Sequence, residues 1–234
     1  MNNKHSLFFP ALIIIMFLSA HLQAQTTAFN KDSFETHWFI EAEQNLYSIR
    51  FMDDTLEITA PKGLTLWRKE KMKGDLTISY YARVMSEGQP NDRLSDLNCF
   101  WKASDPHANH ILSRAAWRKG IFTRYYSLQL YYLGYGGNHN TTTRFRRYDG
   151  NESGIDNPSK RPAVITEYTD PSHLLQANKW YHIVLQCKGP RIRYFIDDQC
   201  IVDYTDPQPL EEGWFGFRTT WSRTQITGFT YNEE

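Results

Sequence analysis

The chain has 234 residues with 26 basic and 26 acidic side chains, so its formal net charge at pH 7 is zero. The total charge therefore gives no support to a strongly charged partner such as nucleic acid. The length suffices for one all-β sandwich domain or for two small domains.

The N-terminal residues are predicted to form a signal peptide that is not part of the fold. A basic residue, Lys4, precedes an apolar run over residues 7–20, which a proline interrupts and which is short for a membrane span. Small side chains favour cleavage after Ala24, although the exact bond stays open. We therefore expect a signal peptide over 1–24, no membrane span after its removal, and a periplasmic or secreted domain over 25–234. An uncleaved anchor is the alternative.

Short runs of strand-forming residues dominate the chain after residue 35, separated by Gly, Pro, Asp or charged turns. No stretch has a sustained helical period, and residues 172–177 have room for a turn or two at most. Evenly spaced strands without alternating helices predict an all-β fold, an antiparallel two-sheet sandwich of the jelly-roll type in a single domain. The expected strands cover residues 56–59, 64–67, 76–83, 125–133, 141–148, 180–187, 191–196, 200–204, 214–218 and 225–231.

The longest run, YYSLQLYYL over residues 125–133, alternates in character and predicts a strand with one apolar face and one polar, aromatic face. We expect the apolar face to meet a core and the other face to line a wet groove. The face assigned to the core carries Tyr126, Leu128, Leu130 and Tyr132, and the face assigned to the groove carries Tyr125, Ser127, Gln129 and Tyr131.

Three cysteines are present, Cys99, Cys187 and Cys200. Cys187 and Cys200 flank a predicted hairpin and could pair in an exported protein, while the odd count leaves at least one free thiol. Three separate, small buried side chains is the preferred interpretation. No Cys or His spacing is typical of zinc, so we predict no metal site and no cofactor. A structural calcium ion stays open, because such sandwiches commonly bind one, but no Asp-rich loop argues for it.

The zero total hides a basic segment over residues 97–148, in which Asp105 is the only acid. Guanidinium groups suit carboxylate, sulfate or phosphate, and the interleaved aromatic rings suit sugar faces. Nucleic acid would also fit, but export argues against it, so we expect an anionic polysaccharide or oligosaccharide as partner. The alternative is that these cations pair with acids elsewhere in the chain. The basic residues are Lys102, Arg114, Arg118, Lys119, Arg124, Arg144, Arg146 and Arg147.

The segment GYGGNHNTTTRFRRY, residues 134–148, combines a glycine-rich loop with a basic strand. Its glycines would let the backbone turn tightly and approach a ligand, although a plain hairpin loop is equally consistent with them. Asn138, His139 and Asn140 would offer hydrogen bonds from the loop. Arg144 and Arg146 would share one face of the strand and read an anion together.

Three motifs resemble an uncharacterised secreted bacterial family that is labelled a domain of unknown function. They are SDLNCFWKASDP (95–106), GYGGNHNTTTRFRRY (134–148) and GWFGFRTTWS (213–222). The family is similar to YesU-type proteins, found beside genes for pectin and rhamnogalacturonan degradation. The closing segments WYHIVL, RYFIDD and GWFGFR also resemble the last strands of concanavalin A-like lectins and glucanases. This resemblance implies a concanavalin A-like sandwich with a role in degrading an anionic plant or algal polysaccharide, such as rhamnogalacturonan or ulvan. The family supplies no agreed reaction, so no catalytic residue is carried over.

A polysaccharide lyase is the leading hypothesis. β-Elimination from a uronate needs a group that neutralises the carboxylate, a base for the C5 proton and an acid for the leaving oxygen. Arg144 or Arg146 with Asn98 could neutralise, and His139 could be the base. The acid would be Tyr125 or Tyr131.

Two other functions stay open. A glycoside hydrolase needs two carboxylates, and the candidates are Glu41 with Glu43, or Asp92 with Asp96. A non-catalytic carbohydrate-binding protein needs only aromatic rings and a shallow face. The oligomeric state also stays open. In every case we expect substrate contacts from Asn98, Trp101, Lys102, Gln129, Asn138, Asn140, Arg146, Arg147, Asp92 and Arg93.

Overall fold

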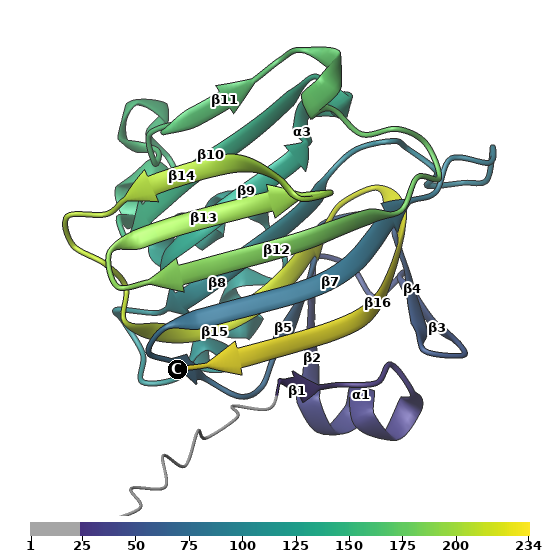
Figure 1. The fold of residues 1–234 in the computed structure, drawn as a ribbon, viewed down its shortest axis with the longest axis horizontal. Coiled ribbons are helices and arrows are strands. Elements are labelled where there is room, and N and C mark those ends of the chain that lie inside the picture. Colours follow the sequence, from purple (N-terminus) through teal and green to yellow (C-terminus); the bar gives the residue numbers. More distant parts are fainter. Residues whose placement is uncertain (1–23) are drawn as a thin grey trace, which may run out of the picture.

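In a computed structural model, which describes residues 24–234, two antiparallel sheets of eight strands each pack face to face (Figure 1). This confirms the predicted all-β sandwich. Sheet A contains β1 (Gln25–Thr26), β3 (Ser48–Met52), β4 (Thr55–Ala60), β7 (Leu76–Val84), β12 (Tyr181–Lys188), β13 (Arg191–Ile196), β14 (Gln199–Thr205) and β16 (Ser222–Glu233). Sheet B contains β2 (Trp38–Ala42), β5 (Leu64–Arg68), β6 (Met72–Lys73), β8 (Leu97–Ser104), β9 (Gln129–Gly136), β10 (Thr142–Asp149), β11 (Thr166–Tyr168) and β15 (Glu212–Thr219).

Strands distant in sequence become neighbours in both sheets. Sheet A runs β14-β13-β12-β7-β16-β4-β3, with β1 on β16, and sheet B runs β11-β10-β9-β8-β15-β5-β2, with β6 on β15. The long β16 therefore pairs with β7 and β4, and β15 lies between β8 and β5. This pairing places β15, from the C-terminal part of the chain, next to β8, from the middle part, with β9 and the arginine-bearing β10 beyond it.

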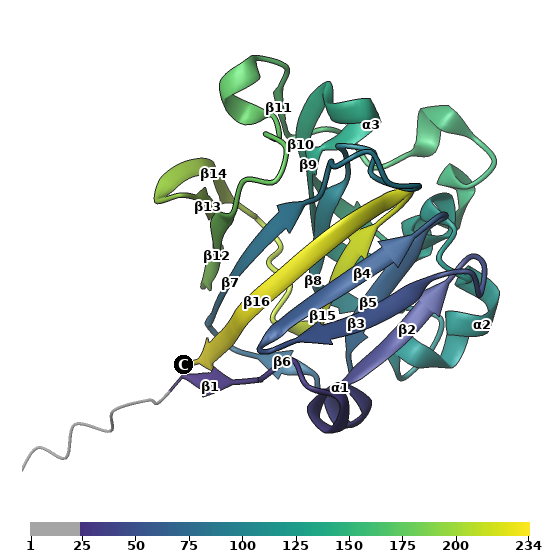
Figure 2. The ribbon, with the colours of Figure 1, turned by 90° about the vertical axis from the view of Figure 1, so that its right-hand side faces the viewer.

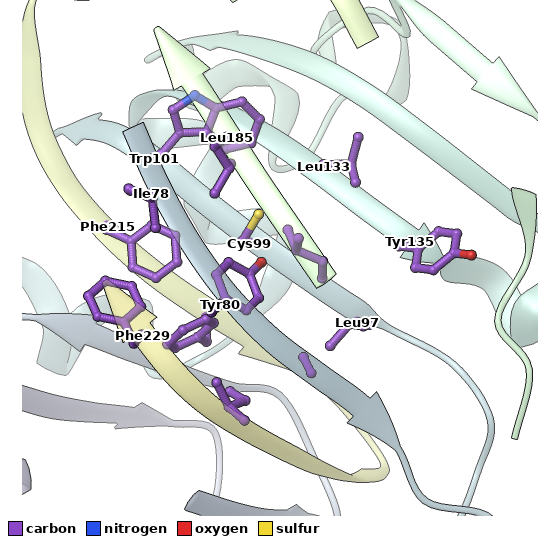
Figure 3. Close-up of a cluster of buried hydrophobic side chains, with 14 of the residues drawn as sticks. Ile78, Tyr80, Leu97, Cys99, Trp101, Leu133, Tyr135, Leu185, Phe215 and Phe229 are labelled. Atoms are coloured by element: carbon purple, nitrogen blue, oxygen red, sulfur yellow. The ribbon is translucent and has the colours of Figure 1, made fainter. Parts of the chain in front are cut away.

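The core lies between the two sheets and follows the period of two. Along β7 the side chains of Leu76, Ile78 and Tyr80 are buried, and those between them are partly exposed. Trp101, Phe215 and Phe229 extend this core across both sheets (Figure 3). Packed alternating faces of this kind are the main stabilising element of a sandwich.

Several elements differ from the sequence-based expectations. Residues 122–127 form a 3₁₀ helix, η2 (Phe122–Ser127), so the strand expected over 125–133 begins only at Gln129. A helix, α1 (Lys31–His37), precedes β2 and was not expected. The strands β2, β3 and β8 were not among the predicted runs either. The region 172–177 has only a short turn, η5 (Pro171–His173).

The predicted signal peptide lies almost wholly outside the described residues. Within the described part, no helix is long and apolar enough to cross a membrane. The three cysteines are free: Cys187 lies in the core and Cys200 is exposed. Cys187 faces Ile192 across the β12–β13 ladder, and Cys200 faces Phe195, so these two thiols do not pair. The preferred interpretation of three separate thiols is confirmed, but the expected burial is wrong for Cys200.

The connection between β8 and β9 folds back over the outer face of sheet B. It contains η1 (Ile111–Arg114), α2 (Ala115–Arg118) and η2. Figure 2 shows α2 beside β2, on the side of sheet B that faces away from sheet A. A second apolar cluster, including Trp67, Phe100 and Tyr125, fills the space beneath this connection. One half of the outer face is therefore covered and the other half is open.

Candidate functional site

A groove lies on the open half of the outer face of sheet B, with a volume of about 360 Å³. Side chains of β8, β9, β10 and β15 form its floor, and loops from several parts of the chain form its walls. The turn labelled α3 (Gly137–Asn140), the β7–β8 loop and the β15–β16 turn supply most of the wall residues. The lining consists of Glu43, Arg93, Asp96, Asn98, Phe122, Tyr132, Gly134, Gly137, Asn138, His139, Thr142, Arg144, Arg146, Arg218 and Thr220.

Arg218, on β15, is the most deeply placed cation of the groove, with 4% of its surface exposed. Its guanidinium carbon lies 5.1 Å from the ring centre of Phe122 and 4.9 Å from that of Tyr125. Nη1 donates to Thr65 Oγ1 (3.2 Å) and to the Gly120 carbonyl (3.0 Å). No carboxylate in the described residues forms an ion pair with Arg218. Glu43 lines the same groove but is not within ion-pair distance of Arg218, so part of the guanidinium keeps its donors free for a ligand.

Arg144 and Arg146 lie side by side on the groove face of β10, as the period of two predicts. Arg144 forms an ion pair with Glu167 on β11. Arg146 donates to the Pro162 carbonyl and has no carboxylate partner among the described residues. The groove lining thus holds four arginines against two carboxylates, Glu43 and Asp96.

Tyr132, Asn98 and Gly134 form a polar patch on the floor. Tyr132 and Asn98 are both buried, and the Asn98 Oδ1 has no hydrogen-bond partner among the described residues. A Cβ at position 134 would fall on the Tyr132 hydroxyl, so only glycine leaves this space open. Burial raises the pKa of Tyr132, and the Asp96 carboxylate raises it further, while Arg218 and Arg146 act the other way. Tyr132 is therefore a neutral phenol that can donate a hydrogen bond.

The turn over residues 136–140 presents a histidine to the groove in an uncommon backbone conformation. Asn138, His139 and Asn140 have φ values of 52°, 60° and 58°, all in the left-handed region. Left-handed conformations cost about 1–2 kcal/mol per non-glycine residue, although asparagine tolerates them better than most. Asn140 compensates by bonding both backbone groups of Leu175, at 2.9 and 2.8 Å. His139 is held in this turn with its side chain exposed at the groove.

The β7–β8 loop forms the opposite rim and is fixed by ion pairs. Arg93 pairs with Asp96 and donates to the carbonyls of Thr220 (2.7 Å) and Trp221 (3.2 Å). Asp92 turns away from the groove and accepts from Arg223 Nε at 2.8 Å. This bond is the main cause of the lowered pKa of Asp92.

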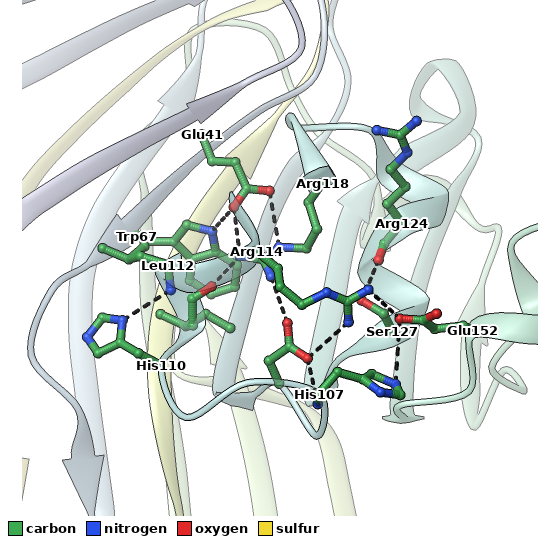
Figure 4. A network of polar contacts seen from close by, with 12 residues as sticks. Glu41, Trp67, His107, His110, Leu112, Arg114, Arg118, Arg124, Ser127 and Glu152 are labelled. Atoms are coloured by element: carbon green, nitrogen blue, oxygen red, sulfur yellow. Dashed lines mark hydrogen bonds and ion pairs between the residues drawn. The ribbon is translucent and has the colours of Figure 1, made fainter. Parts of the chain in front are cut away.

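The covered half of the same face contains a buried ionic network. Arg118, fully buried, donates to Glu41 (2.9 Å) and to Asp105 (3.1 Å) (Figure 4). Glu41 also accepts from Trp67 Nε1 at 3.1 Å, and Arg114 bridges Asp105 and Glu152. Glu41 is thus fixed under the β8–β9 connection and cannot act with Glu43 as a catalytic pair in the groove.

Two expected acid residues do not lie in the groove. Tyr131 points into the core between the sheets, where its hydroxyl donates to Asp206 at 2.6 Å. Tyr125 belongs to η2, and its side chain is fully buried with no hydrogen-bond partner for its hydroxyl among the described residues. The alternation of β9 has the opposite phase to the one expected, so Tyr132, assigned to the core, lines the groove instead.

Several residues expected to contact substrate instead make structural contacts within the protein. Trp101 lies in the core, and Lys102 is buried with Nζ on the carbonyls of Gly74 (2.6 Å) and Glu211 (2.8 Å). Arg147 faces away from Arg146 and pairs with Asp206 at 2.7 Å. Gln129, at the start of β9, lies outside the groove lining, as do Asp92 and Asn140. Those brought together in the groove are Asn98, Arg93, Asn138, His139, Arg144 and Arg146.

The groove also contains residues that were not predicted. Arg218, Tyr132, Phe122 and Thr220 line it. Of these, only Arg218 and Thr220 carried a sequence signal, because both lie in the motif GWFGFRTTWS. Glu43 and Asp96, which were named as candidate hydrolase carboxylates, also line the groove, but their expected partners Glu41 and Asp92 do not. Among residues 24–234 no group of three or more His, Cys, Asp or Glu side chains is placed to hold a metal ion.

The family profile of the domain of unknown function DUF6250 matches residues 58–229, more than half of the chain, so the chain belongs to this family. A comparison with curated protein sequences gives no match.

Solved structures with the same fold share little sequence with this chain. A Bacillus subtilis protein of unknown function with a galectin-like fold aligns with a TM-score of 0.66 at 15% identity, over 90% of this chain and 98% of its own. The carbohydrate-binding module CBM66 of B. subtilis aligns with a TM-score of 0.55 at 14% identity, over 84% and 96%. A structure described as a native glycosidic hydrolase aligns with a TM-score of 0.56 at 9% identity, over 90% and 95%. At these identities the likeness concerns the fold.

Proposed function

We propose that the groove on sheet B binds a carboxylated glycan, and that the protein takes part in degrading a uronic-acid-containing plant or algal polysaccharide. Rhamnogalacturonan and ulvan are the polymers that best suit this proposal. The protein would act outside the cytoplasm, in the periplasm or as a secreted protein, as the predicted signal peptide implies.

The observation that carries the proposal is the unpaired guanidinium of Arg218. It is almost fully buried between two aromatic rings, and only Nη1 has acceptors in the described chain. A carboxylate at this position would accept charge-assisted hydrogen bonds from the free part of the fork. Arg146 lines the same groove, also without a carboxylate partner. We propose that the two guanidinium groups together bind a carboxylate.

Three further points support a glycan as the ligand. The lining combines arginines with the rings of Phe122 and Tyr132, and sugar rings pack their C–H faces on aromatic surfaces. Two of the structurally similar proteins are described as a carbohydrate-binding module and a glycosidic hydrolase. The resemblance to YesU-type proteins favours a uronate polymer over a neutral one.

A second proposal is that the groove cleaves its ligand by β-elimination. The observation that favours it is the joint presence of Tyr132, His139 and Arg218 in one groove. Arg218 and Asn98 would bind the carboxylate and stabilise the negative charge that develops there. His139 would accept the C5 proton. The C5–H electron pair would form the C4=C5 double bond, the C4–O bond would break, and Tyr132 would donate its proton to the leaving oxygen.

The first experiment is to mix the purified protein with homogalacturonan, rhamnogalacturonan, ulvan, alginate and glucuronan in turn. Affinity electrophoresis measures binding, and ultraviolet absorbance measures the C4=C5 double bond. Carboxyl-reduced homogalacturonan is the matched neutral control. We expect retardation by at least one acidic polymer and none by the reduced polymer. Equal retardation by both would contradict a carboxylate site.

Tyr132→Phe separates cleavage from binding. If Tyr132 is the acid, its loss slows cleavage by at least about 100-fold and changes affinity much less. Tyr81→Phe is the control, because Tyr81 is exposed on the outer face of sheet A. Binding without double-bond formation by the wild-type protein would leave the protein as a carbohydrate-binding protein without lyase activity.

A further inference from the structure

A half-exposed tryptophan stands beside the groove, on the turn between β15 and β16. Trp221 has 50% of its surface exposed and a φ of 45°, in the left-handed region. Bulky side chains rarely adopt this conformation, and a large apolar ring open to water contributes little to folding. The turn therefore holds this ring outward at a cost to stability, and such strain is often found at binding sites.

Groove residues fix the orientation of the ring. The Arg93 guanidinium carbon lies 5.2 Å from the Trp221 ring centre, and Arg93 also bonds the backbone carbonyls of Thr220 and Trp221. His139 approaches from the other rim, with its ring centre 6.1 Å from that of Trp221 and the ring planes at 88°. Trp221 thus contacts a residue on each rim of the groove, Arg93 on one and His139 on the other.

A second hollow opens next to this ring. It is lined by Pro61, Lys62, Asn91, Arg93, Thr220 and Trp221 and has a volume of about 360 Å³, as large as the groove itself. Arg93 and Thr220 line both spaces, so the hollow continues the groove. Its lining has two cations, Lys62 and Arg93, and no carboxylate, although Arg93 is already paired with Asp96. Lys62 is exposed and forms no ion pair within the described residues.

We infer that this hollow is a second sugar subsite. In it, Trp221 stacks on the pyranose ring of a bound uronic acid, and Lys62 together with Arg93 binds the carboxylate of the same sugar. The inference rests on the proposed function of the groove and extends it. The ligand would be a chain of several acidic sugars that passes over Arg93 from one space to the other. A short oligosaccharide would fill only the groove, so affinity should increase with chain length.

The test compares disaccharides and hexasaccharides prepared from homogalacturonan, rhamnogalacturonan, ulvan, glucuronan and alginate by titration calorimetry. For the wild-type protein we expect a hexasaccharide to bind more tightly than the matching disaccharide. In Trp221→Gly this gain should fall by roughly tenfold, the size expected for losing one aromatic contact, while disaccharide binding stays unchanged. Trp221→Phe should restore most of the gain.

Glycine is chosen at position 221 so that a loss of affinity cannot be ascribed to misfolding of the variant. Glycine accepts a φ of 45° without strain, so this variant should be at least as stable as the wild-type protein in thermal unfolding. Trp117→Gly is unsuitable as a match because Trp117 lies in α2, so Trp117→Ala is the control. Trp117 is also exposed, and it lies against Arg114 and Arg124 outside the groove lining.

The outcomes separate the two proposals. If the wild-type protein and Trp221→Gly gain equally with chain length, the subsite is refuted and the groove proposal stands. If the wild-type protein binds none of these oligosaccharides, both are refuted. If Trp117→Ala reduces the gain as much as Trp221→Gly does, the effect is not specific to the hollow, and the subsite is refuted as well.

Discussion

The two halves of the outer face of sheet B carry the same kinds of residue and differ in how their charges are paired. In the covered half, Arg118 has Glu41 and Asp105 as partners, and Arg114 has Asp105 and Glu152. In the open half, Arg218 has backbone and hydroxyl acceptors but no carboxylate among the described residues.

This difference shows that a basic composition does not by itself identify a binding site. Half of the eight cations of residues 97–148 are paired with carboxylates in the fold: Arg144 pairs with Glu167 and Arg147 with Asp206, in addition to Arg114 and Arg118 in the covered half. What distinguishes the groove is a buried guanidinium that lines a cavity and has hydrogen-bond acceptors at only one of its nitrogens. Such a group is a better indicator of ligand chemistry than the number of arginines.

The strongest test of the comparison is Arg118→Ala in the covered half. Removing this cation leaves Glu41 and Asp105 buried without a partner, so the free energy of unfolding should fall by about 3–5 kcal/mol. Urea denaturation measures this change. The control is Arg191→Ala, whose exposed pair with Asp203 should contribute at most about 1 kcal/mol. Equal losses in the two variants would contradict the structural role given to the buried network.

Arg218→Met in the open half should change stability little and ligand affinity strongly. Methionine fills the space between Phe122 and Tyr125 and leaves no carboxylate unpaired. The free energy of unfolding should therefore fall by at most about 2 kcal/mol, because Thr65 Oγ1 and the Gly120 carbonyl lose their donor. Affinity for an acidic oligosaccharide should fall about tenfold to a hundredfold, since hydrogen bonds to a charged group contribute about 1.5–3 kcal/mol. Calorimetry and urea denaturation on the same preparation provide both values.

Two comparisons sharpen this prediction. Arg218→Lys keeps the charge and loses the fork, and should bind with intermediate affinity. Arg147→Met removes an arginine of β10, the strand that carries Arg144 and Arg146, but one that pairs with Asp206 outside the groove, and it should leave affinity unchanged. A stable Arg218→Met variant that binds as tightly as the wild-type protein would refute the carboxylate site.

The sandwich could be predicted because most strands have one face against the core and one toward solvent. β7 and β12 show the resulting alternation clearly, and their bounds were predicted to within a residue. β8 is buried along nearly its whole length on both faces, so it has no alternation to detect. The helix α1 spans only seven residues, too few for a visible period, although Asn30 accepts from the Ser33 amide as a typical N-cap.

The site could be predicted where it depends on short local segments of the chain, such as the loop that carries Asn138 and His139 and the strand that carries Arg144 and Arg146. Arg144 and Arg146 share a face because they are two residues apart in one strand, and the sequence shows this directly. In β9 both faces are buried, one in the core and one in the aromatic cluster, so hydrophobicity could not decide between Tyr131 and Tyr132. Arg218 joins the groove because β15 pairs with β8, a neighbour relation across more than a hundred residues that no local pattern reveals.

The smallest predicted effect concerns the rim of the open half, and it depends on pH. The pKa of Asp92 is lowered in the folded protein, mainly by its bond to Arg223, with further bonds from the Glu87 and Gln89 amides. A lowered pKa stabilises the fold above the ordinary carboxyl value, and this stability is lost as the pH falls through the folded value. Between about pH 5 and pH 3 the wild-type protein should therefore lose more stability than Asp92→Asn, which has no charge there to lose. The two unfolding curves should differ at the higher pH and converge at the lower one; parallel curves would show that the rim does not depend on this ion pair.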